Sequence, residues 1–490
     1  MRRRITLVGA LFLLIFALLF LQLNDLQIAK ANSLANAPGN YSSIIKAFST
    51  PRGQILTANG QVMAGSVPST SQYKYQRVYP HGSLYADVTG YYSLIYGTSG
   101  LEYEYNKYLQ GHIAAPSSLG QLFTKSYTTD SVVTTLQSSL QQTAYKALGS
   151  LKGAVVALNP KTGAVLAMAS NPTYNPAPLA SANGTTEQNA WKSYISNSQQ
   201  PLLNRAISRA YPPGSTFKIV TTSAIFDHDP KLARVNFPPV ATIALPQTSH
   251  HLHNYAYEVC GGELPVLLAV SCDTGFAQIG LRLGASNLHN EAEKFGFNQV
   301  PPIDLPGAAA STFPSTSFFS QNLPQLAFSA IGQGNDQATA LQMALVGAGI
   351  ANNGTIMAPH LLGRVISSQD ATVTSFQPKV WKVATSPSTA AKVTQLMVGV
   401  VKSGTAAGIA LPGIQIAAKT GTAQTTLTSH SNIVGQSDNW MVAFAPAQNP
   451  KIAVAVVVPK QPGLSANPTG AQYAGPIVKA MLAAALGVKS

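Results

Sequence analysis

A long apolar segment close to the N-terminus limits where the rest of this chain can fold. Three arginines at positions 2–4 precede an apolar run over 5–21, with Thr6 as its one polar residue, which extends through Gln22 to Leu23. At about 1.5 Å per residue, a helix of this length nearly spans a hydrocarbon core of about 30 Å. We therefore predict a transmembrane anchor over 5–23, with residues 1–4 in the cytoplasm and residues 24–490 outside it.

A cleaved signal peptide is the alternative for this segment, because an A-x-A triplet occurs at 35–37. The triplet lies far from the apolar run and Pro38 follows it, so an uncleaved anchor is favoured. A chain outside the cytoplasm does not meet nucleic acid. Its net charge of +14 therefore indicates an anionic wall polymer or membrane surface as partner.

The two cysteines, Cys260 and Cys272, lie in the exported part of the chain. A disulfide can persist there, and the sequence leaves both a disulfide and free thiols open. A metal site is a further alternative, because His250, His251 and His253 precede Cys260. Zinc ligands usually have tighter, paired spacing, so a polar loop is favoured and no metal is expected.

The pattern of residues changes near position 150. Residues 24–150 are rich in Tyr, Ser, Gly and Thr, with alternating stretches such as 71–79 that are typical of strands, and with helical spacing over 139–148. We expect a mostly β spacer there. Two β-rich runs around a Pro/Gly turn, 153–158 and 164–169, then predict a hairpin.

Helices and further strands follow this hairpin. The expected elements are helices over 215–226, 265–270, 341–352 and 476–486, the last with Pro476 in its first turn, and strands over 414–418, 440–445 and 452–458. Strands at both ends of the segment, around a central block of helices, favour an α+β or α/β domain with an antiparallel sheet.

A serine and a lysine begin the first of these helices. Ser215-Thr-Phe-Lys218 follows Pro212-Pro-Gly214, and because residues i and i+3 share a helix face, the Lys218 amine is expected to reach the Ser215 hydroxyl. A serine nucleophile needs such a base, and a helix N-terminus adds N–H groups that stabilise an oxyanion. The S-x-x-K pattern alone is weak evidence, since two others begin at Ser43 and Ser71.

Two later motifs make the set specific. Ser271-Cys-Asp273 and Lys419-Thr-Gly-Thr422 follow in the order that is typical of penicillin-binding proteins and class A β-lactamases. We expect Ser271 to relay a proton between Lys218 and a leaving amine. Asp273 is expected to accept hydrogen bonds from a substrate amide or a lysine.

The last motif is expected to bind substrate. Lys419 offers a fixed cation for a carboxylate, and Thr420 a hydroxyl beside it. Gly421 leaves room for substrate along a strand, and the N–H of Thr422 is expected to complete an oxyanion hole with that of Ser215. A capping serine at 271 and a surface lysine at 419 are the structural alternatives. A second Lys-Thr-Gly at 161–163 is interpreted as a turn.

The stretch from Arg205 to Lys218 resembles the active-site block of class B penicillin-binding proteins. Further matches are Gly332-Gln-Gly334, Leu341-Gln-Met343, Ile350-Ala-Asn-Asn-Gly354, the Lys-Thr-Gly-Thr-Ala segment 419–423, and 440–446. In the spacer, Arg52-Gly53, Asn59-Gly60 and 97–102 resemble the family's pedestal motifs. The resemblance covers almost the whole exported chain and is closest to the shorter actinobacterial-type members.

This resemblance implies a penicilloyl-serine transferase domain over 149–490, similar to serine β-lactamases, with an antiparallel five-stranded sheet flanked by helices. A non-catalytic pedestal of the dimerisation type over 24–148 precedes it. The implied activity is a peptidoglycan D,D-transpeptidase whose Ser215 attacks stem peptides and is acylated by β-lactams, without a cofactor. The implied partners are a separate glycosyltransferase, such as one of the SEDS family, other cell-wall or division proteins, and the cytoplasmic membrane.

The sequence also departs from the family. Asp273 stands where the family has Asn, and an ionised carboxylate there would favour charged Lys218 and weaken it as a base. The family's acidic residue before Arg-Asn-Gly in the pedestal is missing.

Three alternative functions fit parts of this pattern. A D,D-carboxypeptidase uses the same residues and stays open, whereas a β-lactamase is disfavoured because no E-x-x-L-N pattern appears. A non-catalytic division scaffold or β-lactam sensor is the alternative outside enzymes. Intact Ser215, Lys218, Lys419 and Thr420 argue against it.

Overall fold

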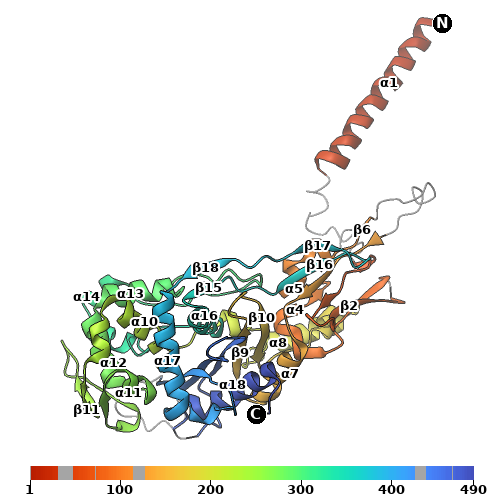
Figure 1. Cartoon of the computed structure of the whole chain (residues 1–490). Helices are drawn as coiled ribbons and strands as arrows, with labels where there is room; N and C mark the ends of the chain where they lie inside the picture. The colour runs from red at the N-terminus through yellow and green to blue at the C-terminus, as the bar shows by residue number, and fades with distance from the viewer. Residues whose placement is uncertain are drawn as a thin grey trace.

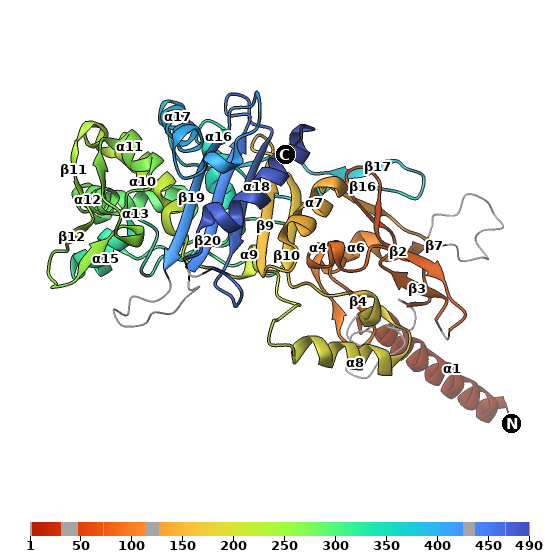
Figure 2. The same ribbon diagram turned by 90° about the horizontal axis from the view of Figure 1, so that it is seen from below.

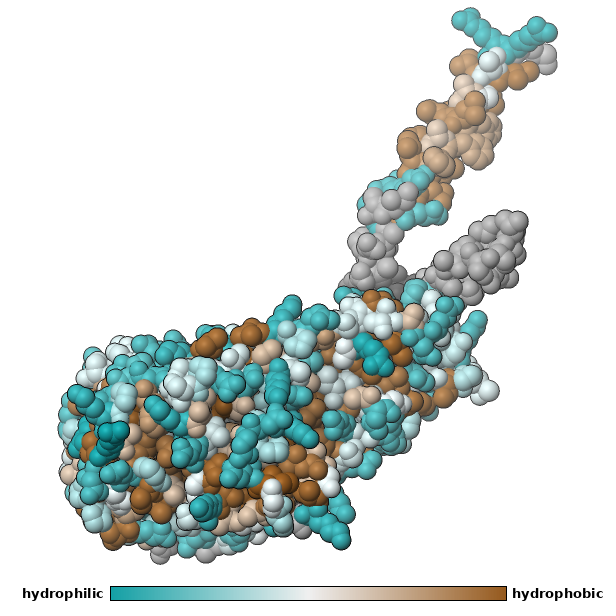
Figure 3. Space-filling view, in the orientation of Figure 1, coloured by the Kyte–Doolittle hydropathy of each residue, from teal (hydrophilic) through white to brown (hydrophobic). Residues whose placement is uncertain are grey.

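The N-terminal helix stands apart from the rest of the molecule. The computed structural model describes residues 2–30, 48–71, 73–113, 127–424, 437–465 and 467–489. Helix α1, Arg2–Asn24, is exposed along its length and projects from the body as an apolar rod (Figures 1 and 3). The helical span Arg2–Gln27 contains an 18-residue stretch with a mean hydropathy of 2.6 and is long enough to cross a membrane. The A-x-A triplet and the S-x-x-K at Ser43 lie outside the described residues.

An antiparallel sheet forms the centre of the C-terminal part. Its five strands follow the order β10-β9-β21-β20-β19, and they are β9 Gly153–Leu158, β10 Val165–Asn171, β19 Ala417–Gln424, β20 Ser437–Ala445 and β21 Ile452–Val458. Strand β9 pairs with β21, so both ends of the segment build one sheet, as predicted. The Ala- and Val-rich runs of β9 and β21 are wholly buried because helices cover both faces.

Three helices cover this sheet. They are α7 Ser138–Leu148, α16 Ala340–Ala351 and α18 Gly470–Leu486. Helices α7 and α18 pack together, with α7 on β10 and α18 on β20 and β21. Helix α16 packs on β9, β20 and β21 from the other side (Figure 2). The predicted start of the last helix at Pro476 is wrong. Thr469 caps the helix by accepting from the Gln472 N–H at 3.2 Å. The helix therefore begins at Gly470, several residues before the proline.

A helical lobe lies beside β19 (Figure 2). Its main elements are α10 Lys218–His228, α11 Leu264–Ala269, α12 Asp273–Leu283, α13 Ala285–Lys294, α14 Thr316–Ser320, α15 Leu323–Ser329 and α17 Pro387–Ser403. Two predicted boundaries shift. The helix expected from Ser215 starts as a 3₁₀ turn, Gly214–Phe217, and the strand expected over 414–418 begins at Ala417 and continues to Gln424.

A second sheet lies in the N-terminal part. Its order is β17-β16-β8-β1-β2-β3, from β1 Ile55–Leu56, β2 Val62–Pro68, β3 Tyr75–Val78, β8 Ser131–Thr134, β16 Leu362–Ile366 and β17 Thr372–Ser375. Short helices α4 Ala86–Thr89, α5 Gly100–Glu104 and α6 Asn106–Leu109 make this part mixed rather than mostly β.

The predicted boundary at 148/149 does not separate the two sheets. Strand β16 pairs antiparallel with β8, so a segment from the predicted transpeptidase domain completes the pedestal sheet. In the other direction, α7 from the predicted pedestal packs on β10 and α18. The sequence could not show this exchange, because the pairing residues Val132 and Val365 are far apart along the chain.

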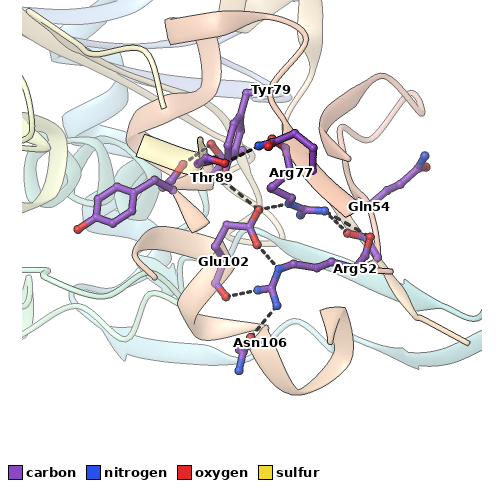
Figure 4. A network of polar contacts seen from close by, with 12 residues as sticks. Arg52, Gln54, Arg77, Tyr79, Thr89, Glu102 and Asn106 are labelled. Atoms are coloured by element: carbon purple, nitrogen blue, oxygen red, sulfur yellow. Dashed lines mark hydrogen bonds and ion pairs between the residues drawn. The ribbon is translucent and has the colours of Figure 1, made fainter. Parts of the chain in front are cut away.

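A buried ionic network holds the pedestal together (Figure 4). The Glu102 carboxylate accepts from Nε of Arg52 and from Nε of Arg77, each at 2.6 Å. Arg52 also donates to Asn106, and the Tyr79 hydroxyl donates to Glu102. The network therefore joins the pedestal motif residues Arg52 and Glu102 through charge as well as packing.

Candidate active site

Ser215 lies on a tight turn at the edge of the sheet. Gly214 has φ +54°, and its N–H donates to the Gly332 carbonyl at 2.8 Å. A Cβ at Gly214 would lie 3.0 Å from the Ala423 nitrogen. The glycine therefore lets the serine turn pack against the end of β19, leaving Ser215 buried except for 7% of its surface.

The Lys218 amine lies among oxygen acceptors. Its Nζ donates to Oδ1 of Asp273 at 2.6 Å and to the Ser271 carbonyl at 2.7 Å, and it lies 3.4 Å from the Ser271 hydroxyl. The Ser215 hydroxyl donates to the same Oδ1 of Asp273 at 3.4 Å. The expected direct bond from Lys218 to Ser215 is thus replaced by a shared carboxylate oxygen.

The protonation of Lys218 reflects two opposing effects. The side chain is fully buried, and burial lowers the pKa of Lys218. The Asp273 carboxylate opposes this shift through its charge and its hydrogen bond, since it stabilises the ammonium form.

A hydrogen bond and a disulfide hold the segment of Ser271 and Asp273. Ser271 has φ +60°, and Asp273 begins helix α12. Asn254 is buried and accepts from the Thr274 N–H at 2.8 Å. Cys272 is joined by a disulfide to Cys260 in β14, Cys260–Gly262. Asn254 was not predicted, because an isolated asparagine gives no pattern in the sequence.

Lys419 is buried on the floor of the site. Its Nζ donates to the Ser271 hydroxyl at 2.8 Å and to the Thr420 carbonyl at 2.9 Å. Burial lowers the pKa of Lys419 well below its usual range; the charge of Lys218 adds to this and Asp273 opposes it. The burial of Lys419 therefore rules out the alternative of a surface lysine, and its surroundings disfavour its charge in the free protein.

The remaining residues of this motif lie along β19. The Thr420 hydroxyl is 2.6 Å from that of Thr405, a residue that no sequence pattern indicated. Packing also requires a glycine at position 421, because a Cβ there would lie 2.8 Å from the Pro213 carbonyl oxygen. Thr422 pairs with Asn439 in the sheet, and its hydroxyl accepts from the Gly470 N–H at 3.2 Å.

The geometry allows acyl transfer on a serine. Ser215, Lys218, Ser271, Asp273 and Lys419 form one chain of hydrogen bonds, drawn from three separate parts of the sequence. The turn of Ser215 and the backbone near Thr422 adjoin each other, which leaves the oxyanion hole at Ser215 and Thr422 a consistent prediction. In the described ranges, no group of three or more His, Cys, Asp or Glu is arranged to hold a metal ion.

Comparison with known proteins identifies the family. Residues 153–483 match the penicillin binding protein transpeptidase domain, and residues 52–131 match the penicillin binding protein A dimerisation domain. Peptidoglycan D,D-transpeptidase PbpA of Mycobacterium tuberculosis is 38% identical over 489 residues, covering 96% of each chain. Its counterpart in Mycolicibacterium smegmatis is 37% identical and covers 98% of each.

Solved structures agree with this likeness. The penicillin G acyl-enzyme complex of penicillin-binding protein A from M. tuberculosis has a TM-score of 0.80 and 37% identity, and the match covers 89% of this chain and 100% of that one. The ceftriaxone complex has a TM-score of 0.80 over 90% of this chain. The chain therefore belongs to the class B penicillin-binding proteins, with their penicilloyl-serine transferase fold.

Proposed function

We propose that this chain is a membrane-anchored peptidoglycan D,D-transpeptidase that cross-links stem peptides through an acyl-enzyme on Ser215. The observation that carries the proposal is the hydrogen-bonded chain from Ser215 through Asp273 and Lys218 to Ser271 and Lys419. Such a chain can take a proton from a serine and return it to an amine within one buried site. The β-lactam complexes of similar proteins support acylation by the same class of inhibitor.

In the acylation step, Ser215 Oγ attacks the carbonyl of the penultimate D-Ala, and its proton passes to the Lys218 amine through the shared Asp273 oxygen. The C–O bond to Ser215 forms and the C–N bond to the terminal D-Ala breaks. Ser271, between Lys218 and Lys419, passes the proton to the leaving amine. The N–H groups of Ser215 and Thr422 bind the oxyanion.

In the second step, an amine of a neighbouring stem peptide attacks the ester. Its proton returns along the same chain of groups, and Ser215 leaves as a hydroxyl. Lys419 and the Thr420 hydroxyl act before this step: they bind the carboxylate of the donor's terminal D-Ala during acylation, which favours the ammonium form of Lys419 by pairing it, and this carboxylate departs with the leaving D-Ala. A D,D-carboxypeptidase would differ only in taking water as the acceptor.

Helix α1 places the enzyme at the membrane. Its apolar length suits an anchor, and arginines 2–4 favour a cytoplasmic N-terminus with the catalytic part on the extracellular side. Because the pedestal forms a sheet with the catalytic segment, it suits a spacer between membrane and wall. A separate glycosyltransferase, of the SEDS family, and other cell-wall or division proteins are the partners that we propose for it.

Intact mass of the detergent-purified chain after incubation with a penicillin tests the proposal. Wild type is expected to gain one penicilloyl group, and Ser215→Ala none. Ser71→Ala, at another S-x-x-K, is the matched control and is expected to keep the adduct. An adduct on Ser215→Ala, or none on wild type, would refute the proposal, and an adduct that forms and quickly disappears would indicate a β-lactamase.

A further inference from the structure

The disulfide joins the segment of Ser271 and Asp273 to a strand at the surface. Cys272 lies between these two residues and is buried, with 1% of its surface exposed. Its partner, Cys260, begins β14, which pairs with β11, Phe237–Val240. Figures 1 and 2 place β11 at the end of the helical lobe that lies away from the pedestal. The bond therefore leads from the site of acylation to the outside of the lobe.

A hollow of about 650 Å³ opens at the outer end of this bond. Cys260 lines the hollow and is itself partly exposed. Five exposed apolar residues line it as well: Pro238, Pro239, Val259, Val266 and Val270. A separate cleft, which Asp273 and Thr422 line, shares no described residue with this hollow. The outer end of the disulfide therefore has an opening to solvent that is distinct from the active site.

The inner end of the bond lies between two groups that hold the Lys218 amine. This amine donates to the Ser271 carbonyl at 2.7 Å and to Oδ1 of Asp273 at 2.6 Å. The Lys419 amine donates to the Ser271 hydroxyl at 2.8 Å. Ser271 has φ +60°, a left-handed conformation that a serine keeps only where its surroundings hold it. The disulfide at Cys272 is a covalent constraint on this strained segment, so its loss gives the segment new freedom.

We infer that Cys260 is a site of thiol–disulfide exchange through which an external dithiol controls acylation, with Cys260 and Cys272 as positioning residues for Ser271 and Asp273. The inference rests on the proposed transpeptidase function. With the bond intact, the segment holds its two oxygen acceptors against Lys218 and acylation is fast. With the bond reduced, the segment is placed less precisely and acylation slows, because a displacement of about 1 Å can lower a rate strongly.

The exchange is a balanced transfer of two electrons. A thiolate of the dithiol attacks Sγ of Cys260, the S–S bond breaks, and Sγ of Cys272 leaves as a thiolate. In its buried surroundings this thiolate takes up a proton and becomes a thiol. The second thiolate of the dithiol attacks the mixed disulfide and releases Sγ of Cys260, which is protonated in turn. The protein disulfide is thus reduced, and the dithiol is oxidised to its own disulfide.

Other contacts should keep the lobe folded after reduction. Asn254 accepts from the Thr274 N–H at 2.8 Å, and the Cys272 N–H donates to the Leu267 carbonyl at 2.8 Å. Helix α11, which lies between the two cysteines in the chain, packs on α17. None of these contacts requires the S–S bond. Reduction is therefore expected to loosen the segment of Ser271 and Asp273 without unfolding the protein.

Penicillin acylation of the detergent-purified chain, before and after incubation with dithiothreitol, tests the inference. Alkylation followed by intact mass reports whether both thiols have formed. Reduction should lower the acylation rate at saturating penicillin about tenfold, with little change in the penicillin concentration that gives half of this rate. Oxidised glutathione should then restore the rate. A bond that resists reduction in the folded protein, or an unchanged rate after reduction, would overturn the inference. Failure of the oxidised protein to be acylated would instead overturn the proposed function.

Cys260→Ser and urea unfolding separate positioning from loss of structure. Cys260→Ser should be acylated as slowly as the reduced wild type, and dithiothreitol should not slow it further. Both proteins should still unfold cooperatively in urea, as circular dichroism would show. Fast acylation of Cys260→Ser contradicts the inference. So does a reduced protein that is already unfolded without urea, because the bond would then be needed for folding alone.

A bulky residue in the hollow tests the route of the dithiol. Val266→Trp fills part of the hollow, so reduction by dithiothreitol should slow by about threefold or more. Acylation of the oxidised protein should be unchanged. Val380→Trp, at an exposed valine of β18, Val380–Val383, is the matched control and should keep both wild-type rates. Equal reduction rates in the two variants would show that the dithiol does not enter through the hollow, and would overturn the inference.

Discussion

Asp273 links Ser215, the proposed nucleophile, to Lys218, its proposed base. The same carboxylate oxygen accepts from Ser215 and from Lys218, and it lies at the start of α12 where unpaired N–H groups favour negative charge. The residue that stands where the family has asparagine therefore places a carboxylate between Ser215 and Lys218. Its effect should appear in the protonation of Lys218, which burial alone pushes toward the neutral amine.

Replacing Asp273 with Asn tests this effect. Because the carboxylate raises the pKa of Lys218 against the effect of burial, Asp273→Asn should lower that pKa further. Acylation needs the neutral amine of Lys218, so its rate should rise at lower pH than in wild type. The acidic limb of the pH–rate profile should move by about one pH unit toward lower pH. Penicillin acylation rates measured between pH 5 and 9 check this. Asp370→Asn, on an exposed turn, should leave the limb in place, and a shift to higher pH would contradict the argument.

Thr405 is expected to position the Thr420 hydroxyl, which it contacts at 2.6 Å. Thr405→Val keeps the shape but removes the partner, so acylation should slow by about fivefold, the equivalent of one ordinary hydrogen bond. Thr405→Ser should restore the rate. Urea unfolding of the three proteins should coincide. A slow Thr405→Ser, or a loss of stability that accounts for the slow rate, would assign Thr405 a structural role instead.

The proposed catalytic residues and the residues that position them differ in how well the sequence indicates them. Ser215, Lys218 and Lys419 belong to motifs whose order could be recognised, and the structure brings them together with Ser271 and Asp273. Thr405 and Asn254 could not be predicted, because each acts through one contact with a residue distant in the chain. The environment of Lys419 was also beyond prediction, since its burial depends on several packed segments.

At the scale of single elements, the sequence predicted those helices and strands whose apolar residues follow one regular pattern along the whole element. The hairpin of β9 and β10, the strand β21 and the helix α16 all lie where the sequence placed them, within a few residues. Errors occurred where a specific side chain decides the boundary. The sequence predicts Pro476 in the first turn of the last helix, whereas the Thr469 cap starts α18 earlier.

The cap of α18 should therefore contribute measurably to stability. Thr469→Ala removes the oxygen that accepts from the Gln472 N–H, and the free energy of unfolding should fall by about 1 kcal/mol. Thr469→Ser retains an oxygen and should lose much less. Urea unfolding followed by circular dichroism measures both. Equal losses in the two variants would show that the threonine methyl group, rather than the cap, matters.

At the scale of the whole molecule, the two sheets are not independent units. The pedestal sheet contains β16 and β17, and α7 lies on the catalytic sheet. Asp304 adds a further connection: its carboxylate accepts from the N–H groups of Leu361 and Leu362, and from the hydroxyl of Tyr105 in the pedestal. Contacts between segments so far apart in sequence leave no local pattern, which is why the predicted boundary could not include them.

Because the two sheets exchange elements, we expect a substitution that destabilises the pedestal to destabilise the catalytic part as well. Burial raises the pKa of Glu102, but Arg77 and Arg52 outweigh it, so the net pKa is lowered. The carboxylate therefore stabilises the fold above about pH 4.5, its unfolded value, and this contribution is lost as pH falls through the lower folded pKa. Glu102→Gln leaves two buried arginines without their charge partner and should cost about 3 kcal/mol at pH 7.

Calorimetry of the detergent-purified chain measures both consequences. The difference in unfolding temperature between wild type and Glu102→Gln should shrink as the pH is lowered toward 3.5. Glu104→Gln, on an exposed carboxylate in the same helix, is the control and should match wild type. Because β8 pairs with β16, pedestal and catalytic part should unfold in one transition that moves as a whole. A separate low-temperature transition in Glu102→Gln, with penicillin binding retained above it, would show instead that the pedestal melts alone and that the shared strands couple the two sheets only weakly.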